Sequence, residues 1–356
     1  MSRTPWDNGN MFKSGLRASE PPLPVAKADL TGRTVIIIGA NVGLGFECAK
    51  HMARMNPSRL VLGCRNEREG SRAVEDIKKE TSFQNVELRL IDLAKFVSVR
   101  SFAQKFIEEV GTLDILLANA AILPTKHEST VDGWEVALQV NHLSLSLLTL
   151  LLLPTMIETS KTSKNSPRIV MVTSQMHTQT TLDDELLALP QEDGSSILRY
   201  MSDEDMGKGY CKREEVINRR YGDTKLFGVF FARTLSDRLS KSKSNIIVNV
   251  VDPGRCVSQL IRTLPDPIRE NMMTLAIEDG YTAEEGSRAL VYGAVGDLGE
   301  DKLRGAHLRR GRKTEFGEFV LTEEGEKLGS RIWDETIDIL REVDGNIGDI
   351  HSKFLC

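Results

Sequence analysis

The chain has 356 residues, 40% of them hydrophobic and 27% charged, a composition typical of globular proteins. Its 46 Lys and Arg residues and 51 Asp and Glu residues give a net charge of -5, so no overall attraction to nucleic acid or to an anionic membrane is expected. Any anion-binding site must therefore be local. The length permits two domains or one large α/β unit.

Residues 1–31 lack an apolar signal core, and we interpret them as a polar N-terminal arm. The five cysteines are odd in number and show no C-x-x-C spacing, which suits free thiols in a reducing compartment, so a cytoplasmic protein is expected. The six histidines are scattered without metal-ligand spacing, so no metal is expected.

From residue 34 onward, short apolar runs alternate with helical patterns. The runs at 34–38, 59–64, 86–92, 113–119, 168–174 and 245–252 are predicted to be strands buried on both faces. Apolar residues recur at helical intervals over 45–55, 67–80 and 97–110. This alternation predicts an α/β fold over residues 32–345, a single doubly wound, Rossmann-type parallel sheet with helices on both faces.

The apolar segment 143–157 contains Ser, Thr and Pro154 and is too short to span a bilayer, so we expect a helix in the core or at a subunit contact rather than a transmembrane segment. A polar segment, 176–220, is far longer than an ordinary connection. We interpret it as an insertion and lid before the helix that carries Tyr221. Residues 259–345 are expected to form a substrate-side C-terminal region, followed by a tail, 346–356.

The first predicted strand runs directly into G-A-N-V-G-L-G, with Gly39, Gly43 and Gly45 at the turn into the next helix. Glycines there let a backbone approach a pyrophosphate, and the helix N-terminus supplies amide donors for the anion. The same residues could form an ordinary tight turn. Their position after the first strand of a βαβ pattern favours a dinucleotide site.

Arg65 lies 20 residues after Gly45, near the position where folds that bind NAD place a carboxylate. A guanidinium there would attract the 2'-phosphate of NADP. The alternative is a surface arginine that pairs with the following helix. We therefore expect NADPH to be preferred over NADH.

Tyr221 and Lys225 are four residues apart and share one face of a predicted helix that begins near Tyr221. In isolation this spacing is equally that of an ordinary decorated helix. Its meaning depends on motifs that occur in order along the chain: the glycine turn, "NAA" (119–121), "NHLS" (141–144), "VTS" (172–174), "YGDTK" (221–225) and "DPGRCVSQL" (252–260).

As an ordered set these motifs resemble the short-chain dehydrogenase/reductase family over about residues 32 to 345. The residues from Gly305 onward further resemble the retinol-dehydrogenase-like branch and fungal-type biosynthetic ketoreductases of secondary metabolism. The resemblance implies four catalytic residues, which are Asn141, Ser174, Tyr221 and Lys225. It also implies cofactor contacts from Gly39, Asn41, Gly43, Leu44, Gly45, Arg65, Asp92, Leu93, Asn119, Ala120, Tyr221, Lys225, Pro253, Gly254, Cys256 and Ser258.

The chemistry agrees with the roles that the resemblance implies. Hydride transfer to a carbonyl places negative charge on oxygen, so Tyr221 is expected as general acid in reduction and base in oxidation. Lys225 would lower the pKa of Tyr221 and hold the nicotinamide ribose, and Ser174 would hydrogen-bond the substrate oxygen. Asn141 would position a water that relays protons to Lys225. Cys256 is expected to be a packing group rather than a reactive thiol.

Two residues depart from the family pattern. Ile38 replaces a threonine whose hydroxyl would tie the glycine turn to "NAA", and Asp252 places a carboxylate before Pro253, near the cofactor cleft. The function expected from the sequence is NADPH-dependent interconversion of a ketone or aldehyde and an alcohol on a small lipophilic substrate. The alternative is a non-catalytic, NADP-binding regulator or scaffold. A homodimer through the helices near Leu143 and Tyr221 is a further expectation.

Overall fold

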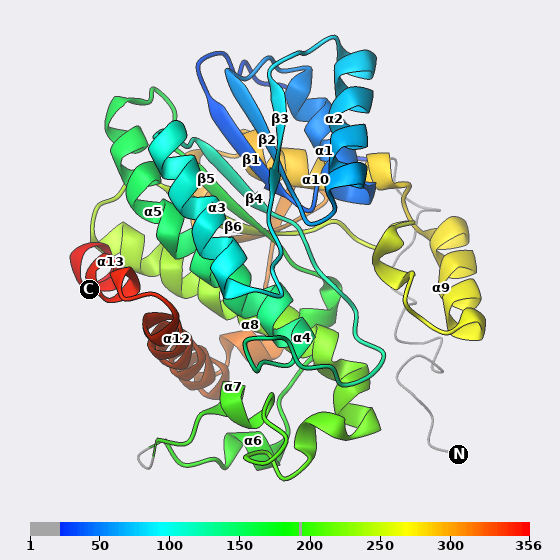
Figure 1. Ribbon diagram of the computed structural model, residues 1–356, viewed down its shortest axis with the longest axis vertical. Coiled ribbons are helices and arrows are strands. Elements are labelled where there is room, and N and C mark those ends of the chain that lie inside the picture. The colour runs from blue at the N-terminus through cyan, green and yellow to red at the C-terminus, as the bar shows by residue number, and fades with distance from the viewer. Residues whose placement is uncertain (1–21, 192–193) are drawn as a thin grey trace.

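The computed structural model describes residues 22–191 and 194–356, so most of the expected N-terminal arm lies outside the described residues. Its centre is an eight-stranded sheet with the order β3-β2-β1-β4-β5-β6-β7-β8 (Figure 1). The strands are β1 Thr34–Ile38, β2 Arg59–Cys64, β3 Val86–Leu90, β4 Ile115–Ala118, β5 Arg168–Val172, β6 Ile247–Asp252, β7 Ala306–Arg309 and β8 Arg312–Thr314. The first seven pair in parallel and β8 runs antiparallel to β7, which confirms the predicted α/β, Rossmann-type sheet.

Two features of the sheet differ from the sequence prediction. β3 is an edge strand, and Leu90 is 49% exposed, so the expectation that it is buried on both faces was wrong. β7 and β8 were not predicted, and β7 extends the parallel sheet beyond β6. Whether a strand lies at the edge of the sheet depends on the order of all strands, and the residues of the strand itself do not determine that order.

Helices cover both faces of the sheet, and the sheet separates the core into two apolar layers. On one face lie α1 Gly43–Ala53, α2 Glu67–Thr81 and α10 Ala283–Val295. The other face is covered by α3 Phe96–Glu109, α5 Ser144–Thr162, α8 Glu214–Lys241, α12 Glu323–Val343 and α13 Asn346–Phe354. The remaining α-helices are α4 Val136–Leu138, α6 Asp184–Leu187, α7 Ile197–Tyr200, α9 Asp266–Asp279 and α11 Glu300–Leu303.

The apolar segment around α5 is a core helix. Among the described residues, one helical stretch, Val136–Thr162, is long and apolar enough to cross a membrane by length and composition, but 89% of its most apolar window is buried inside the protein. A helix that is apolar on all sides is expected where other elements surround it. The burial agrees with the predicted core role.

The helix that carries Tyr221 begins at Glu214, two turns earlier than predicted. Its first turns are polar in sequence, but Arg220 is only 1% exposed. The Arg220 guanidinium lies 3.5 Å from Glu135 and donates to the carbonyl of Met201 at 2.7 Å. A buried arginine with such partners cannot be distinguished from a surface one by sequence pattern alone.

The tail expected at 346–356 is a helix integrated into the core. Ile347 and Ile350 of α13 belong to the same apolar cluster as α5, and α13 packs on both α5 and α12. On the neighbouring helix, the indole of Trp333 stacks on the Phe231 ring of α8 with 5.3 Å between ring centres. The outer faces of α5 and α8 are therefore covered by this chain's own C-terminal helices (Figure 1).

Candidate active site

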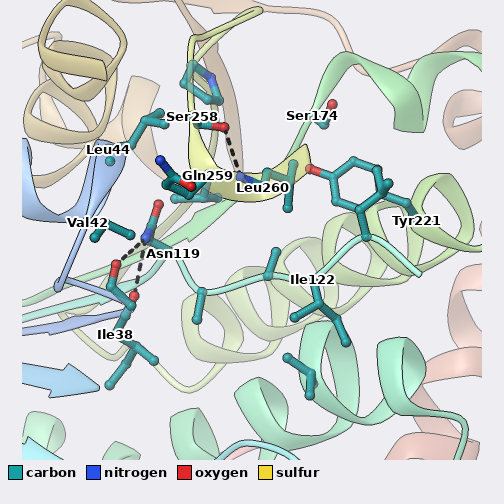
Figure 2. A pocket seen from close by; sticks show the side chains of 18 of the residues that line it. Ile38, Val42, Leu44, Asn119, Ile122, Ser174, Tyr221, Ser258, Gln259 and Leu260 are labelled. Carbon is teal, nitrogen blue, oxygen red and sulfur yellow. Dashed lines mark hydrogen bonds between the residues drawn. The ribbon is translucent and has the colours of Figure 1, made fainter. Parts of the chain in front are cut away.

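A cavity of about 760 Å³ opens at the carboxyl ends of the strands. It lies at the neighbouring strands β1 and β4, from which the strand order continues toward opposite edges of the sheet. This is the place at which doubly wound sheets bind ligands. Figure 2 shows side chains from the glycine turn, β4, β5, α8 and the loop after β6 around it. Every residue predicted to bind cofactor or substrate lines this cavity except Gly45 and Asn141.

Gly45 serves close packing rather than direct contact. A Cβ on this residue would lie 2.2 Å from the carbonyl oxygen of Gly39 and 2.7 Å from Nδ2 of Asn119. That same Nδ2 donates to the carbonyl of Gly39 at 2.9 Å and, more weakly, to Ile38 at 3.4 Å (Figure 2). Asn119 thus ties the glycine turn to β4 without the threonine that Ile38 replaces.

The N-terminus of α1 is suited to an anion. Its N-cap, Val42, has no side-chain acceptor for the first amides, and the first turn carries no acidic residue. Residues Asn41, Gly43 and Leu44 of this turn line the cavity, and Gly43 adopts a φ of +62° that favours glycine. The unsatisfied amides of such a helix end bind phosphate groups, so the residues fit the pyrophosphate of a dinucleotide.

Arg65 follows the end of β2 and lines the same cavity. Among the described residues no ion pair involves Arg65, so the surface-pair alternative raised by the sequence finds no support. Asn66 instead caps α2, accepting from the Glu69 amide at 3.0 Å. Glu69 also lines the cavity, a carboxylate that sequence reasoning missed, and its Oε2 accepts from Asn41 at 2.9 Å.

Ser174, Tyr221 and Lys225 converge at the inner part of the cavity. The Ser174 hydroxyl is close enough to the Tyr221 phenol to lower its pKa, and both side chains border the open space in Figure 2. The Lys225 ammonium lies 5.5 Å from the centre of the tyrosine ring and donates to the carbonyl of Val172 at 2.7 Å. The end of β5 and one face of α8 therefore bring together residues that are distant in sequence.

The electrostatics of this triplet differ from the sequence prediction. Burial, followed by the charge of Asp252, raises the pKa of Tyr221 above its usual range, and the Ser174 hydrogen bond lowers it in part. Burial also lowers the pKa of Lys225 to about 8, against the opposing effect of Asp252. The structure therefore does not show the predicted lowering of the tyrosine pKa by Lys225, because desolvation disfavours the charged form of both groups.

Asn141 lies behind this site, in a single π-helical turn, Gln139–Leu143, between α4 and α5. Its amide is fixed by Ile122, whose N–H donates to Oδ1 at 2.8 Å and whose carbonyl accepts from Nδ2 at 2.9 Å. Nδ2 also donates to Thr224 at 3.0 Å. A cavity of about 10 Å³ is lined by Asn141, Thr224 and Lys225 among others, close to the smallest space that holds one water.

The wall opposite the glycine turn is apolar. A small cluster joins Leu123, Tyr221 and Leu264 to half-buried neighbours that include Met176, Leu260 and Met272. Met272 lies on α9, a helix whose sole buried residue is Ala276. Because so little of α9 is buried, the helix packs on the protein through one face, and this face borders the cavity. The sequence signal for this role was the four-residue spacing of Ile268, Met272 and Ala276, which marks one helix face.

Most of the segment expected to be a lid lies elsewhere. Within 176–220, Met176 and Gln179 are the described residues that line the cavity. α6 and α7 gather instead beside α12, away from α9 (Figure 1). Glu335 of α12 accepts from the amides of Ile197 and Leu198, each at 3.0 Å, and thereby anchors α7. Most of the described part of 176–220 therefore lies away from the cavity, whereas α9, within the expected 259–345 region, borders it through Met272.

Arg309 and Cys256 complete the wall near Asp252. Arg309 lines the cavity from β7 and was missed because that strand was missed. The Cys256 thiol packs against Gly286, where a Cβ would lie 2.3 Å from its sulfur. Burial raises the pKa of Cys256 well above the usual value for a thiol, which makes it a poor nucleophile. All five cysteines are free.

Comparison with known proteins agrees with this architecture. The family model for short chain dehydrogenases matches residues 33–182. The chain is 31% identical to short chain dehydrogenase/reductase dmxR8 of Cryptosporiopsis sp. over 320 residues, which cover 88% of this chain and 92% of the relative. It is also 31% identical to short-chain dehydrogenase anuD of Penicillium roqueforti, with coverage of 92% and 82%.

Among solved structures, a short chain dehydrogenase of Shigella flexneri 2a complexed with NADP superimposes with a TM-score of 0.56 at 20% identity, covering 80% of this chain and all of that one. At this identity the likeness shows the fold. The sequence relatives support membership of the family as well as the fold, because their similarity extends over both the cofactor half and the substrate half of the chain. This protein belongs to the short-chain dehydrogenase/reductase family of oxidoreductases.

Proposed function

We propose that the protein is an NADPH-dependent carbonyl reductase that converts a ketone or aldehyde on a small lipophilic substrate into an alcohol. The observation that carries this proposal is the convergence of Ser174, Tyr221 and Lys225 on one cavity, which also contains the glycine turn and Arg65. A binding module needs the glycine turn, but it has no use for a buried tyrosine beside a buried lysine. The scaffold alternative is therefore disfavoured.

When bound, NADPH supplies the hydride. The protein's own residues manage the charge that develops on the substrate oxygen. Ser174 donates a hydrogen bond to that oxygen and Tyr221 gives it a proton. Burial keeps the phenol protonated at neutral pH, which is the state that an acid requires.

Lys225 and Asn141 have supporting roles. At a pKa of about 8, Lys225 is mostly an ammonium at neutral pH and can hold the ribose hydroxyls of the cofactor. The small cavity between Asn141 and Lys225 has the size for a water that returns a proton toward Tyr221. Asn141 is fixed on both sides of its amide, as a positioning group should be.

The substrate is proposed to be mostly apolar because of the wall around Leu123, Met176, Leu260 and Met272. Such a wall binds by burying apolar area, whereas the few polar groups fix orientation. The fungal relatives favour a reaction in secondary metabolism. Free thiols suit a cytoplasmic location.

The proposed function is tested by mixing the protein with NADPH and a panel of aliphatic, alicyclic and aromatic ketones and aldehydes. We expect consumption of NADPH with the larger apolar carbonyls and a much slower reaction with NADH. Formation of the alcohol is confirmed by mass spectrometry. Tight NADPH binding without turnover of any panel member, and with no effect of these compounds on NADPH binding, would favour the scaffold.

We further infer a monomer, in place of the homodimer that the sequence suggested. α12 and α13 occupy the outer faces of α8 and α5, and a dimer through these two helices would have to displace Trp333 from its stack on Phe231. Light scattering on a sizing column should return the mass of one chain across the micromolar range. The mass of two chains would contradict the inference.

A further inference from the structure

The carboxylate of Asp252 is buried next to the residues that carry the proposed chemistry. It ends β6 and is 2% exposed. Its Oδ1 accepts a hydrogen bond of 2.9 Å from the Gly254 amide. Its Oδ2 has no hydrogen-bond partner among the described residues. A buried carboxylate oxygen without a hydrogen-bond partner lowers the stability of the folded protein, so its presence in the cavity wall suggests a function.

Arg309 stands directly beside this carboxylate. The two residues are paired in register between β6 and β7, with 3.6 Å between Nε of Arg309 and Oδ2 of Asp252. Nη2 of Arg309 also donates to the side-chain oxygen of Gln175 at 3.1 Å. Gln175 follows Ser174 in the chain, and all three residues of this contact line the cavity. The ion pair is therefore part of the reaction cavity.

The charge of Asp252 acts on ionisable groups from each element around it. These groups are Tyr221 and Lys225 of α8, Cys256 of the following loop, His177 after β5 and His307 of β7. Burial lowers the pKa of His177 to about 4 and lowers that of His307, so both rings are neutral near pH 7. The remaining charges at neutral pH are those of Asp252, Arg309 and Lys225.

We propose that Asp252 is a positioning residue that keeps the proton on both Tyr221 and Lys225, and thereby prepares the site for carbonyl reduction rather than alcohol oxidation. This inference rests on the proposed function, in which Tyr221 is the acid of the reductive reaction. A nearby negative charge favours the protonated form of a phenol and of an amine alike. Arg309 limits the effect because it compensates part of the carboxylate charge.

The test follows the ionisation of Lys225 directly, by carbon NMR of protein labelled at the Cε atoms of its lysines. Lys225→Arg assigns the signal. In the wild type this lysine should titrate near pH 8, well below ordinary lysines. In Asp252→Asn its midpoint should fall by about one pH unit, because a favourable charge is lost. In Arg309→Met it should rise, because the carboxylate is no longer compensated.

Asp114→Asn is the matched control. Asp114 is also a buried carboxylate of the sheet, 4% exposed, but it precedes β4 at the opposite end of the strands, so the Lys225 midpoint should stay in place. Simple loosening of the wall would hydrate Lys225 and raise its midpoint in Asp252→Asn, opposite to the proposal. An unchanged or raised midpoint in that variant overturns the inference, and so does a lowered one in Arg309→Met.

The measurement requires no substrate, so it separates this inference from the proposed function. NADPH fluorescence titrations on the same samples test the latter: a wild type that does not bind NADPH would defeat the proposed function, while the lysine midpoints still decide whether Asp252 controls protonation. With a carbonyl identified by the ketone panel, Asp252→Asn should also move the pH profile of the reverse, oxidative reaction to lower pH.

Discussion

Tyr221→Phe should abolish turnover while leaving the fold and NADPH binding intact. The substitution removes the phenolic proton donor that faces the cavity next to Ser174 and keeps the ring that packs with Leu123 and Leu264. Loss of a general acid costs about 10² to 10⁴ in rate. We expect kcat to fall by about 10³-fold or more, measured as NADPH consumption with the best carbonyl of the panel.

The control for this variant is Tyr292→Phe, which makes the same chemical change on α10, outside the cavity, and should retain wild-type kcat. Circular dichroism and the NADPH dissociation constant establish that both variants fold and bind. Activity of Tyr221→Phe within tenfold of the wild type would refute the assigned mechanism. A parallel loss of NADPH binding in Tyr221→Phe would instead indicate damage to the cavity.

The sequence was most informative where a strand or helix is defined by its own residues. β1, β2, β5 and β6 are short apolar runs, and their burial between two helical layers is apparent from composition. The glycine turn was equally predictable because its spacing is imposed by close backbone approach, as the 2.2 Å contact of a hypothetical Gly45 Cβ shows. These are local constraints that local sequence records.

Properties that depend on the rest of the fold were not predictable. β7 has the sequence A-H-L-R, which is too short and too polar to stand out, and it is a strand because β6 offers it an edge. The pKa of Tyr221 depends on burial that no motif records. The position of the insertion before Tyr221 suggested a lid, but its placement depends on contacts with Glu335 and Arg331, about 140 residues further along the chain.

The residues of the candidate site could be predicted more reliably than the residues that surround them. Ser174, Tyr221 and Lys225 lie at ends or faces of regular elements, which the topology of a parallel sheet brings to one edge. Arg309 and Met272 reach the cavity from elements whose positions follow from packing. Function lies in the site placed on a scaffold rather than in the scaffold itself. We therefore propose that substrate specificity depends on α9 and on Arg309 of β7, both of which line the cavity.

Arg65→Ala should remove most of the preference for NADPH over NADH. The guanidinium lies at the end of β2 without an ion-pair partner among the described residues, so it is available to a 2'-phosphate. Charged hydrogen bonds of this kind contribute about 1.5–3 kcal/mol, which corresponds to roughly 10- to 100-fold in affinity. We expect the NADPH dissociation constant to rise by that factor, whereas that for NADH changes little, because NADH has no phosphate there.

Arg68→Ala provides the matched control, since it removes an exposed arginine three residues away on α2 that does not line the cavity. If long-range attraction alone favoured NADPH, both variants would weaken its binding alike and added salt would erase the difference. A direct contact predicts an effect confined to Arg65→Ala and retained at high salt. Equal weakening of NADPH binding and NADH binding in Arg65→Ala would contradict this prediction and show that Arg65 supports the shape of the adenine end of the cavity. Glu69, which accepts a hydrogen bond from Asn41, would then be the group that decides which cofactor binds.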